Sequence, residues 1–231
     1  MTKNYLHIFF DLDRTLWDFR KNSAETLSDI LNKFNLNEFV QSSEEFTERY
    51  NFYNDRLWVY FRSGQIQKHQ LRYERFRLLL KDYGIKNAKL TAEISRYYLN
   101  MSPAKTILIP GAIEVLEYLM PNYNLYILSN GFYDVQLTKM VNSGISHYFK
   151  KLFTSDRIGY SKPDSRIFDY AVKSVNARKA ESLIVGDDDQ VDITGAKNAR
   201  IDQVLFNPEG RSTSVKATYE LKKLIDLRQI L

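Results

Sequence analysis

Short apolar segments alternate with amphipathic segments along the second half of the chain, from about residue 107 onward. The amphipathic segments repeat apolar residues at helical spacing, whereas the short apolar runs are typical of buried strands. The expected strands are Leu125–Leu128, Leu152–Thr154, Leu183–Val185 and Val204–Phe206, and the expected helices are Ala112–Leu119, Val135–Asn142, Arg166–Val175 and Ile193–Ala199. Because strands joined through helices form parallel sheets, this region predicts an α/β fold.

The first half of the chain follows a different pattern. Tyr5–Phe10 is apolar and predicts one further strand, after which helical spacing continues for most of the following segment. Asn22 with Glu25, and Ser42 with Glu45, have the spacing of capping boxes, which predicts helix starts at both places. Aromatic residues are frequent here, and at helical spacing they usually form the core of a helix bundle. We therefore expect a sheet domain whose first strand is separated from the others by an inserted helical domain.

Composition and charge exclude several classes of protein and site. The 231 residues are 44% hydrophobic and 26% charged, which is typical of a globular protein with a substantial core. The absence of cysteine excludes disulfides and thiolate chemistry, and the three histidines lack the spacing of a zinc site. The net charge of +5 comes from scattered basic residues, so we expect a small anionic partner and no nucleic-acid polymer. The apolar start is too short for a signal peptide or a membrane span, which predicts a cytoplasmic protein without membrane attachment.

Four polar segments follow expected strands, where open parallel sheets place their binding sites. The first contains Asp11 and Asp13, two carboxylates that are unfavourable side by side unless a cation or a proton lies between them. Mg²⁺ takes carboxylate oxygens and bridges to phosphate, so a magnesium site is one interpretation. A turn with capping aspartates explains this pair equally well when it is considered alone.

The second segment is Ser129-Asn130-Gly131, which combines a hydroxyl, an amide and the free N–H groups of a helix start. These groups can bind phosphate, although they are also ordinary turn residues. The third segment contains Lys162, before Pro163 at a possible helix start, where an ammonium could neutralise both a phosphate and a nucleophile. On its own such a lysine is more often simply solvated.

The fourth segment has four aspartates within six positions after an expected strand: Asp187, Asp188, Asp189 and Asp192. Turns seldom need so many carboxylates, so this segment predicts an acidic pocket that requires a cation.

In their order along the chain, the four segments resemble the haloacid dehalogenase superfamily of aspartyl phosphatases. That superfamily carries DxDx(T/V), then a strand-end Ser or Thr, then Lys, then GDxxxxD. The matching residues are Asp11, Asp13, Thr15, Ser129, Lys162, Asp187 and Asp192. The resemblance covers nearly the whole chain. It implies a Rossmann-like, doubly wound parallel-sheet core formed by residues 1–17 and 106–231, with an α-helical cap domain of the C1 type at residues 18–105.

The resemblance also implies a reaction. Asp11 would be the nucleophile that forms an aspartyl-phosphate, and Asp13 would protonate the leaving oxygen and later deprotonate water. Lys162 would act as a catalytic and phosphate-binding residue together with Ser129 and Asn130. The substrate would be a small phosphate monoester.

A bound Mg²⁺ is the cofactor that the resemblance implies. Its ligands would be Asp11, Asp187 and the backbone carbonyl of Asp13. Asp192 would lie behind these ligands and orient Lys162 or a metal-bound water.

Finer matches resemble the nucleoside 5′-monophosphate phosphatase branch, whose members prefer pyrimidine nucleotides. They are the residues from Asp13 to Phe19, Ser129-Asn130-Gly131 and Phe206-Asn207-Pro208. Arg14 stands where the family more often has glycine, and Asp188 and Asp189 replace a frequent serine and leucine.

Three alternatives remain open from the sequence. A sugar-phosphate phosphatase or a phosphomutase would use the same core. A receiver-like signalling module also places aspartates, a hydroxyl and a lysine around Mg²⁺, but the helical insertion and Asp13 argue against it.

Both a monomer and a homodimer are compatible with the sequence.

Overall fold

The structure is a computed structural model that describes residues 4–231. The chain divides into two compact units, which we call the sheet unit (residues 4–19 and 106–231) and the helical unit (Arg20–Lys105). The division falls at residues 19/20 and 105/106, where the sequence led us to expect boundaries at 17/18 and 105/106. Each unit is described by itself.

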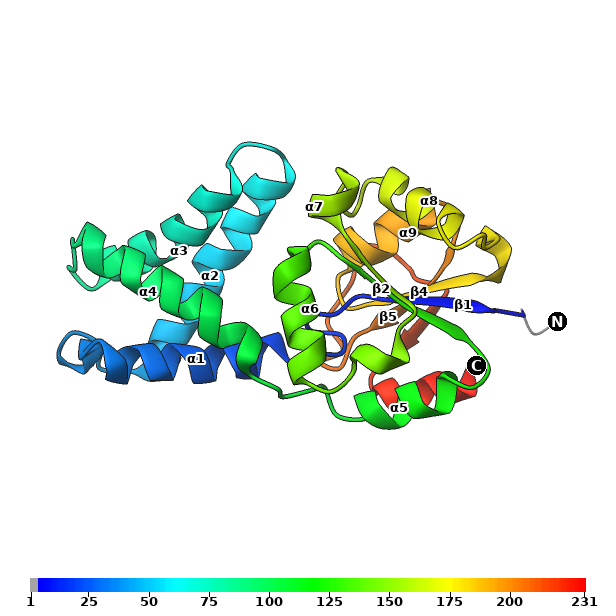
Figure 1. The fold of residues 1–231 in the computed structure, drawn as a ribbon, viewed down its shortest axis with the longest axis horizontal. Helices are drawn as coiled ribbons and strands as arrows, with labels where there is room; N and C mark the ends of the chain where they lie inside the picture. The colour runs from blue at the N-terminus through cyan, green and yellow to red at the C-terminus, as the bar shows by residue number, and fades with distance from the viewer. Residues whose placement is uncertain (1–3) are drawn as a thin grey trace. The chain divides into compact units, whose positions relative to one another are not determined.

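Six parallel strands form the sheet of the sheet unit, in the spatial order β3-β2-β1-β4-β5-β6 (Figure 1). They are β1 (His7–Phe10), β2 (Asn124–Ser129), β3 (Lys151–Thr154), β4 (Ser182–Gly186), β5 (Asp202–Phe206) and β6 (Tyr219–Leu221). The strand order reverses at β1, which pairs with β2 on one side and β4 on the other. This arrangement confirms the predicted doubly wound α/β fold, and it identifies the carboxyl end of β1 as the point where such sheets bind ligands.

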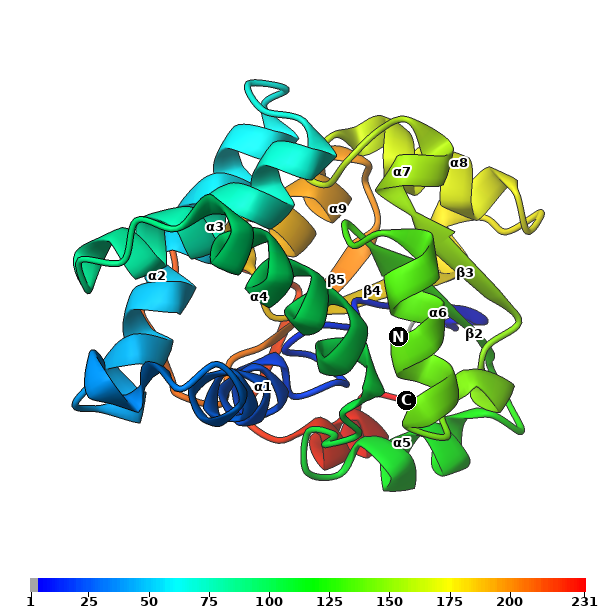
Figure 2. The same ribbon diagram turned by 60° about the vertical axis from the view of Figure 1, so that its left-hand side comes forward.

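Helices cover both faces of this sheet (Figures 1 and 2). The helices of the sheet unit are α5 (Ala112–Leu119), α6 (Tyr133–Asn142), α7 (Ser155–Ile158), α8 (Ser165–Lys173) and α9 (Thr194–Asn198). Phe9 packs with α8 and α9 on one face, whereas Ile8 and Phe10 pack with α5 on the other. Burial on both faces explains why the strands are continuous apolar runs rather than alternating ones.

The helical unit is built from α1 (Phe19–Lys33), α2 (Ser43–Arg62), α3 (Lys68–Asp82) and α4 (Ala88–Met101). Aromatic rings fill its core, with Tyr50 and Phe76 fully buried and both in ring contact with Tyr98. Packing is thus the main role of the aromatic residues in this segment. No helix within residues 4–231 is long and apolar enough to cross a membrane.

The two expected capping boxes have different outcomes. Ser42 caps α2, because its Oγ accepts a hydrogen bond from the Glu45 N–H (3.1 Å). Asn22 does not start a helix, because α1 already begins at Phe19 and Asn22 is fully buried within it. The chain therefore enters α1 directly from the turn that follows β1, and the prediction at Asn22 is wrong.

Candidate active site

The nucleophile candidate Asp11 lies directly after β1, at the reversal of strand order. Its N–H donates to the carbonyl of Val185 on β4 (2.8 Å), which fixes the backbone as it leaves the sheet. The chain then turns tightly, since the carbonyl of Leu12 accepts the N–H groups of both Leu16 (2.9 Å) and Trp17 (2.8 Å). Arg14 adopts a left-handed backbone with φ of 68° in this turn. That conformation favours glycine, which explains why glycine is the commoner residue at this position in the family pattern.

Lys162 is a buried ammonium with three acceptors, one for each of its hydrogens. Its Nζ lies 2.7 Å from Asp11 Oδ1, 2.6 Å from Asp192 Oδ1 and 2.8 Å from the carbonyl of Leu128. The side chain is 2% exposed, as is that of Asp192. Lys162 therefore joins the residue that follows β1, a backbone carbonyl of β2 and a residue of the segment after β4 into one network.

Asn130 holds the backbone of Lys162 in place. The Lys162 N–H donates to Asn130 Oδ1 (2.8 Å), and Asn130 Nδ2 donates to the Lys162 carbonyl (2.9 Å). Ser155 in turn donates to the Asn130 carbonyl (3.1 Å). The side chain of Asn130 thus supports Lys162, which leaves only its backbone for the phosphate-binding role expected from the sequence.

Burial and mutual repulsion shift the pKa values of the acidic groups upward. Burial raises the pKa of the Asp11 carboxyl to about 7, although the Lys162 ammonium acts in the opposite direction. The pKa of Asp187 is raised well above its ordinary value by burial and then by the charges of Asp11 and Asp192. For Lys162, burial alone would lower the pKa, but the two adjacent carboxylates outweigh it and raise the pKa. The Lys162 ammonium, even together with the charge of Arg14 acting on Asp187, therefore does not compensate the three carboxylates.

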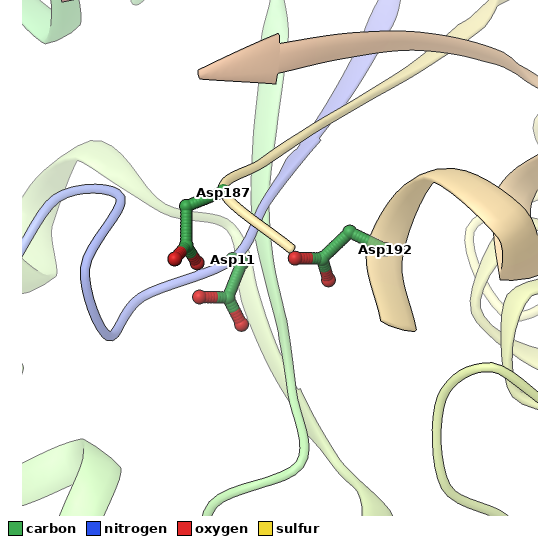
Figure 3. Close-up of side chains that lie close together, drawn as sticks. All are labelled: Asp11, Asp187 and Asp192. Carbon is green, nitrogen blue, oxygen red and sulfur yellow. The ribbon is translucent and has the colours of Figure 1, made fainter. Parts of the chain in front are cut away.

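These three carboxylates form a possible cation site. Asp11, Asp187 and Asp192 each contribute an oxygen, and the three oxygens lie within 4.8 Å of one another (Figure 3). Both oxygens of Asp192 are already occupied, one by Lys162 and the other by the Asp188 N–H (3.2 Å). Among the described residues nothing donates a hydrogen bond to the Asp187 carboxylate. An all-oxygen donor set with surplus negative charge fits a hard cation such as Mg²⁺, which the free oxygens of Asp11 and Asp187 could hold.

The aspartate-rich segment after β4 contributes less to this cluster than its composition suggests. Asp188 caps a π-helical turn, η5 (Asp189–Ile193), by accepting the N–H groups of Gln190 and Val191 (both 2.9 Å). Asp189 Oδ2 accepts the N–H and the hydroxyl of Ser214 (both 3.0 Å). The prediction of an acidic pocket therefore holds for Asp187 and Asp192, which belong to the cluster, but not for Asp188 and Asp189.

Two side chains on α6 bind Asp13, and one of them also binds Ser129. Gln136 Nε2 donates to Asp13 Oδ2 (2.8 Å) and to Ser129 Oγ (2.7 Å). Lys139 Nζ lies 2.6 Å from Asp13 Oδ1. Neither Gln136 nor Lys139 was identified from the sequence, although both fall on an expected helix, three positions apart, directly after Ser129-Asn130-Gly131.

Glycines allow the close approaches in this site. A Cβ at Gly186 would lie 2.4 Å from Asp192 Cγ, and one at Gly131 would lie 2.5 Å from the Gln136 side chain. Both positions therefore need a residue without a side chain for Asp192 and Gln136 to reach their partners.

Comparison with known proteins agrees with this geometry. The sequence model of the haloacid dehalogenase-like hydrolases matches residues 8–206. The HAD-hydrolase YfnB of Bacillus subtilis is 30% identical, over 99% of this chain and 96% of its own. Two pyrimidine 5′-nucleotidases are 29% identical: YjjG of Escherichia coli (97% of this chain, 96% of its own) and PynA of Streptococcus pneumoniae (98% and 95%).

A solved structure supports the same relationship. The magnesium-bound crystal structure of YfnB from Bacillus subtilis superposes with a TM-score of 0.90, covering 99% of each chain at 29% identity. The fold, the order of the four motifs and these matches agree, and the family predicted from the motifs is confirmed: the chain belongs to the haloacid dehalogenase-like hydrolases.

Proposed function

We propose that this protein is a Mg²⁺-dependent phosphatase that hydrolyses pyrimidine nucleoside 5′-monophosphates through an aspartyl-phosphate on Asp11. The enzyme class, a phosphoric monoester hydrolase, follows from the family and from the relatives named as 5′-nucleotidases. The observation that carries the mechanism is the contact of Lys162 with both Asp11 and Asp192 at the reversal of strand order. Asp13 stands two residues beyond the nucleophile, where phosphate chemistry needs an acid–base group and dehalogenation does not.

The reaction proceeds in two steps. An Asp11 carboxylate oxygen attacks phosphorus, the bond to the leaving oxygen breaks, and Asp13 gives that oxygen its proton. Water then attacks the phosphorus of the aspartyl-phosphate while Asp13 takes a proton from it, which releases inorganic phosphate and restores Asp11. General acid–base help of this kind contributes roughly 10²- to 10⁴-fold.

Two groups are positioned to hold the phosphoryl oxygens. Ser129 Oγ accepts hydrogen bonds from Gln136 Nε2 and from the Gly131 N–H (3.0 Å), so the hydroxyl hydrogen is left to donate to an anion. Lys162 acts through its charge, because all three of its hydrogens already have acceptors. A direct contact between Lys162 and phosphate would require it to release one of them.

Mg²⁺ would be held by Asp11, Asp187 and, from the family pattern, the Asp13 backbone carbonyl. It would supply positive charge between the nucleophile and the phosphate, two groups that otherwise repel each other.

Metal binding should be visible as a change in thermal stability. A cation that binds the folded state but not the unfolded chain stabilises the protein by about 2.7 kcal/mol at a free concentration about 100 times its dissociation constant. For a chain of this size the corresponding rise in Tm is about 5–10 °C. We expect the Asp187→Asn variant to lose this rise and, without metal, to melt no lower than the wild type.

Asp189→Asn is the matched control, because Asp189 belongs to the same acidic segment but is bonded to Ser214. This variant should keep the Mg²⁺-dependent rise, measured by scanning calorimetry at constant ionic strength. A wild-type Tm that does not respond to Mg²⁺, or an equal loss in both variants, would contradict the ligand assignment.

The substrate assignment is tested by phosphate release across pyrimidine monophosphates, purine monophosphates and sugar phosphates. We expect kcat/KM for the pyrimidine monophosphates to exceed the others by about 10-fold or more, since a site that hydrogen-bonds a base rejects one that lacks the matching groups. A higher kcat/KM for sugar phosphates than for nucleoside monophosphates would keep the mechanism and overturn the nucleotide assignment. No release from any monoester would overturn the proposed function.

Two further assignments belong to this proposal. The helical unit (Arg20–Lys105) is the cap domain of the enzyme, in the place along the chain that the family pattern gives it. The compartment predicted from the sequence, the cytoplasm, is the second of these assignments.

A further inference from the structure

Helix α6 carries two buried polar side chains, Gln136 and Lys139, whose bonds to Asp13 the mechanism above does not use. Gln136 is fully buried and Lys139 is 5% exposed. They are three positions apart, so both lie on the same face of the helix. Burial of an ammonium is costly unless it is paired, so the position of Lys139 needs a physical reason.

Gln136 uses both amide hydrogens on two different groups of the site. One bonds Asp13 Oδ2 and the other Ser129 Oγ, which places the acid–base carboxylate and the phosphate-binding hydroxyl side by side. The reverse orientation of the amide would set its oxygen against the Asp13 carboxylate, so the network itself assigns the orientation. Gly131 leaves the space into which this amide fits.

Lys139 holds the other oxygen of Asp13. Its Nζ lies 2.6 Å from Asp13 Oδ1 and 4.3 Å from the centroid of the Trp17 ring. Trp17 is fully buried in the core, so its ring position is fixed, and the Lys139 ammonium makes a cation–π contact with it. Both Asp13 oxygens are therefore bound by side chains of α6, and together they fix the rotamer of Asp13.

We propose that Gln136 and Lys139 are positioning residues that orient the Asp13 carboxylate toward the leaving oxygen and set its spacing from the Ser129 hydroxyl. The inference rests on the proposed function, because it assigns a purpose to the acid–base group of that reaction. The Asp13 side chain is 29% exposed, so water could solvate it without either partner. Because water can reach Asp13, the buried donors Gln136 and Lys139 are not needed to solvate its carboxylate. We therefore infer that they orient it.

The test compares two kinds of leaving group. An alkyl phosphate such as a nucleoside 5′-monophosphate needs a proton on its leaving oxygen, whereas p-nitrophenyl phosphate releases a stable phenolate without one. The ratio of kcat/KM for the two substrates measures how well Asp13 delivers that proton, because kcat/KM reports the steps up to departure of the leaving group. Lys139→Met should lower kcat/KM for the alkyl substrate about 10- to 100-fold, with at most a few-fold change for the aryl substrate. Gln136→Met also removes a hydrogen bond to the phosphate-binding Ser129, so it should lower kcat/KM for both substrates, and more strongly for the alkyl one.

Two further variants make the comparison decisive. Asp13→Asn should shift the ratio in the same direction, and Lys139→Met added to it should cost nothing more, because residues that act through one group are not additive. Lys173→Met, an exposed lysine at the end of α8, should leave the ratio unchanged. Melting temperatures show whether each variant is folded.

The outcomes separate this inference from the proposed function. Equal losses on both substrates, or full additivity with Asp13→Asn, would show a merely structural role and overturn the inference. A ratio shifted by Asp13→Asn but by neither α6 variant would also overturn it, while the proposed function stands. If Asp13→Asn leaves the ratio unchanged, the acid–base role of Asp13 is wrong and the inference falls with it.

Discussion

Replacement of Asp11 by asparagine is expected to lower kcat by about 10⁴-fold or more, the scale on which nucleophile removal acts in other covalent enzymes. The amide has nearly the same shape as the carboxylate, and its oxygen can still accept a hydrogen bond from Lys162 Nζ. It lacks the charge and the nucleophilicity needed to attack phosphorus. The loss should therefore appear in kcat for every monoester, whichever leaving group is used.

Stability measurements distinguish this loss from unfolding. Burial raises the pKa of the Asp11 carboxyl to about 7, which shows that the ionised form is unfavourable in its surroundings. A neutral amide should therefore melt at the wild-type temperature or above it, while Asp189→Asn serves as an active control with one carboxylate fewer. Phosphate release by Asp11→Asn at the wild-type rate would mean that another group is the nucleophile.

The sheet could be predicted from the sequence because its strands are buried on both faces. The expected strand Leu125–Leu128 lies within β2 (Asn124–Ser129), and the expected helix Ala112–Leu119 matches α5 at both ends. Strand β6 was not predicted, since it has three residues, lies at the edge of the sheet and carries an exposed glutamate at its centre. The other edge strand, β3 (Lys151–Thr154), has the apolar run that β6 lacks, and it was predicted as Leu152–Thr154.

The site could be predicted only in part, for a geometric reason. A residue that directly follows an interior strand must lie at the carboxyl edge of the sheet, and this places Asp11 and Asp187 from sequence alone. The directions of side chains within a turn are not fixed in this way. Asp188 and Asp192 point to different partners. Asp188 caps the π-helical turn η5 and accepts N–H groups of that turn, whereas Asp192, which lies within the turn, contacts Lys162.

The two residues on α6 show the same limit. Gln136 and Lys139 are ordinary polar residues on an amphipathic helix, and such residues usually face solvent. The rotation of α6 about its axis, set by the burial of Met140 in the core, turns them toward Asp13 instead. Sequence spacing shows that they share a face, but not which group that face meets.

Replacement of Lys162 by methionine is expected to destabilise the protein by about 3–5 kcal/mol, because it removes one partner of a buried charged network. Methionine fills similar space but leaves Asp11 and Asp192 without a counter-charge and the Leu128 carbonyl without its donor. The change is measured as a shift in the urea unfolding midpoint without Mg²⁺. The exposed Lys173→Met control should change stability by no more than about 0.5 kcal/mol.

Addition of Asp192→Asn to the Lys162→Met variant separates the structural from the catalytic role of the lysine. The double variant should recover part of the lost stability, because one of the two uncompensated carboxylates becomes a neutral amide of the same shape. Phosphate release should not recover, because the ammonium that neutralises Asp11 and the incoming phosphate is still missing. Recovery of both would show that Lys162 only balances the charge of Asp192, and recovery of neither would show that its bond to the Leu128 carbonyl, rather than charge, holds the network together.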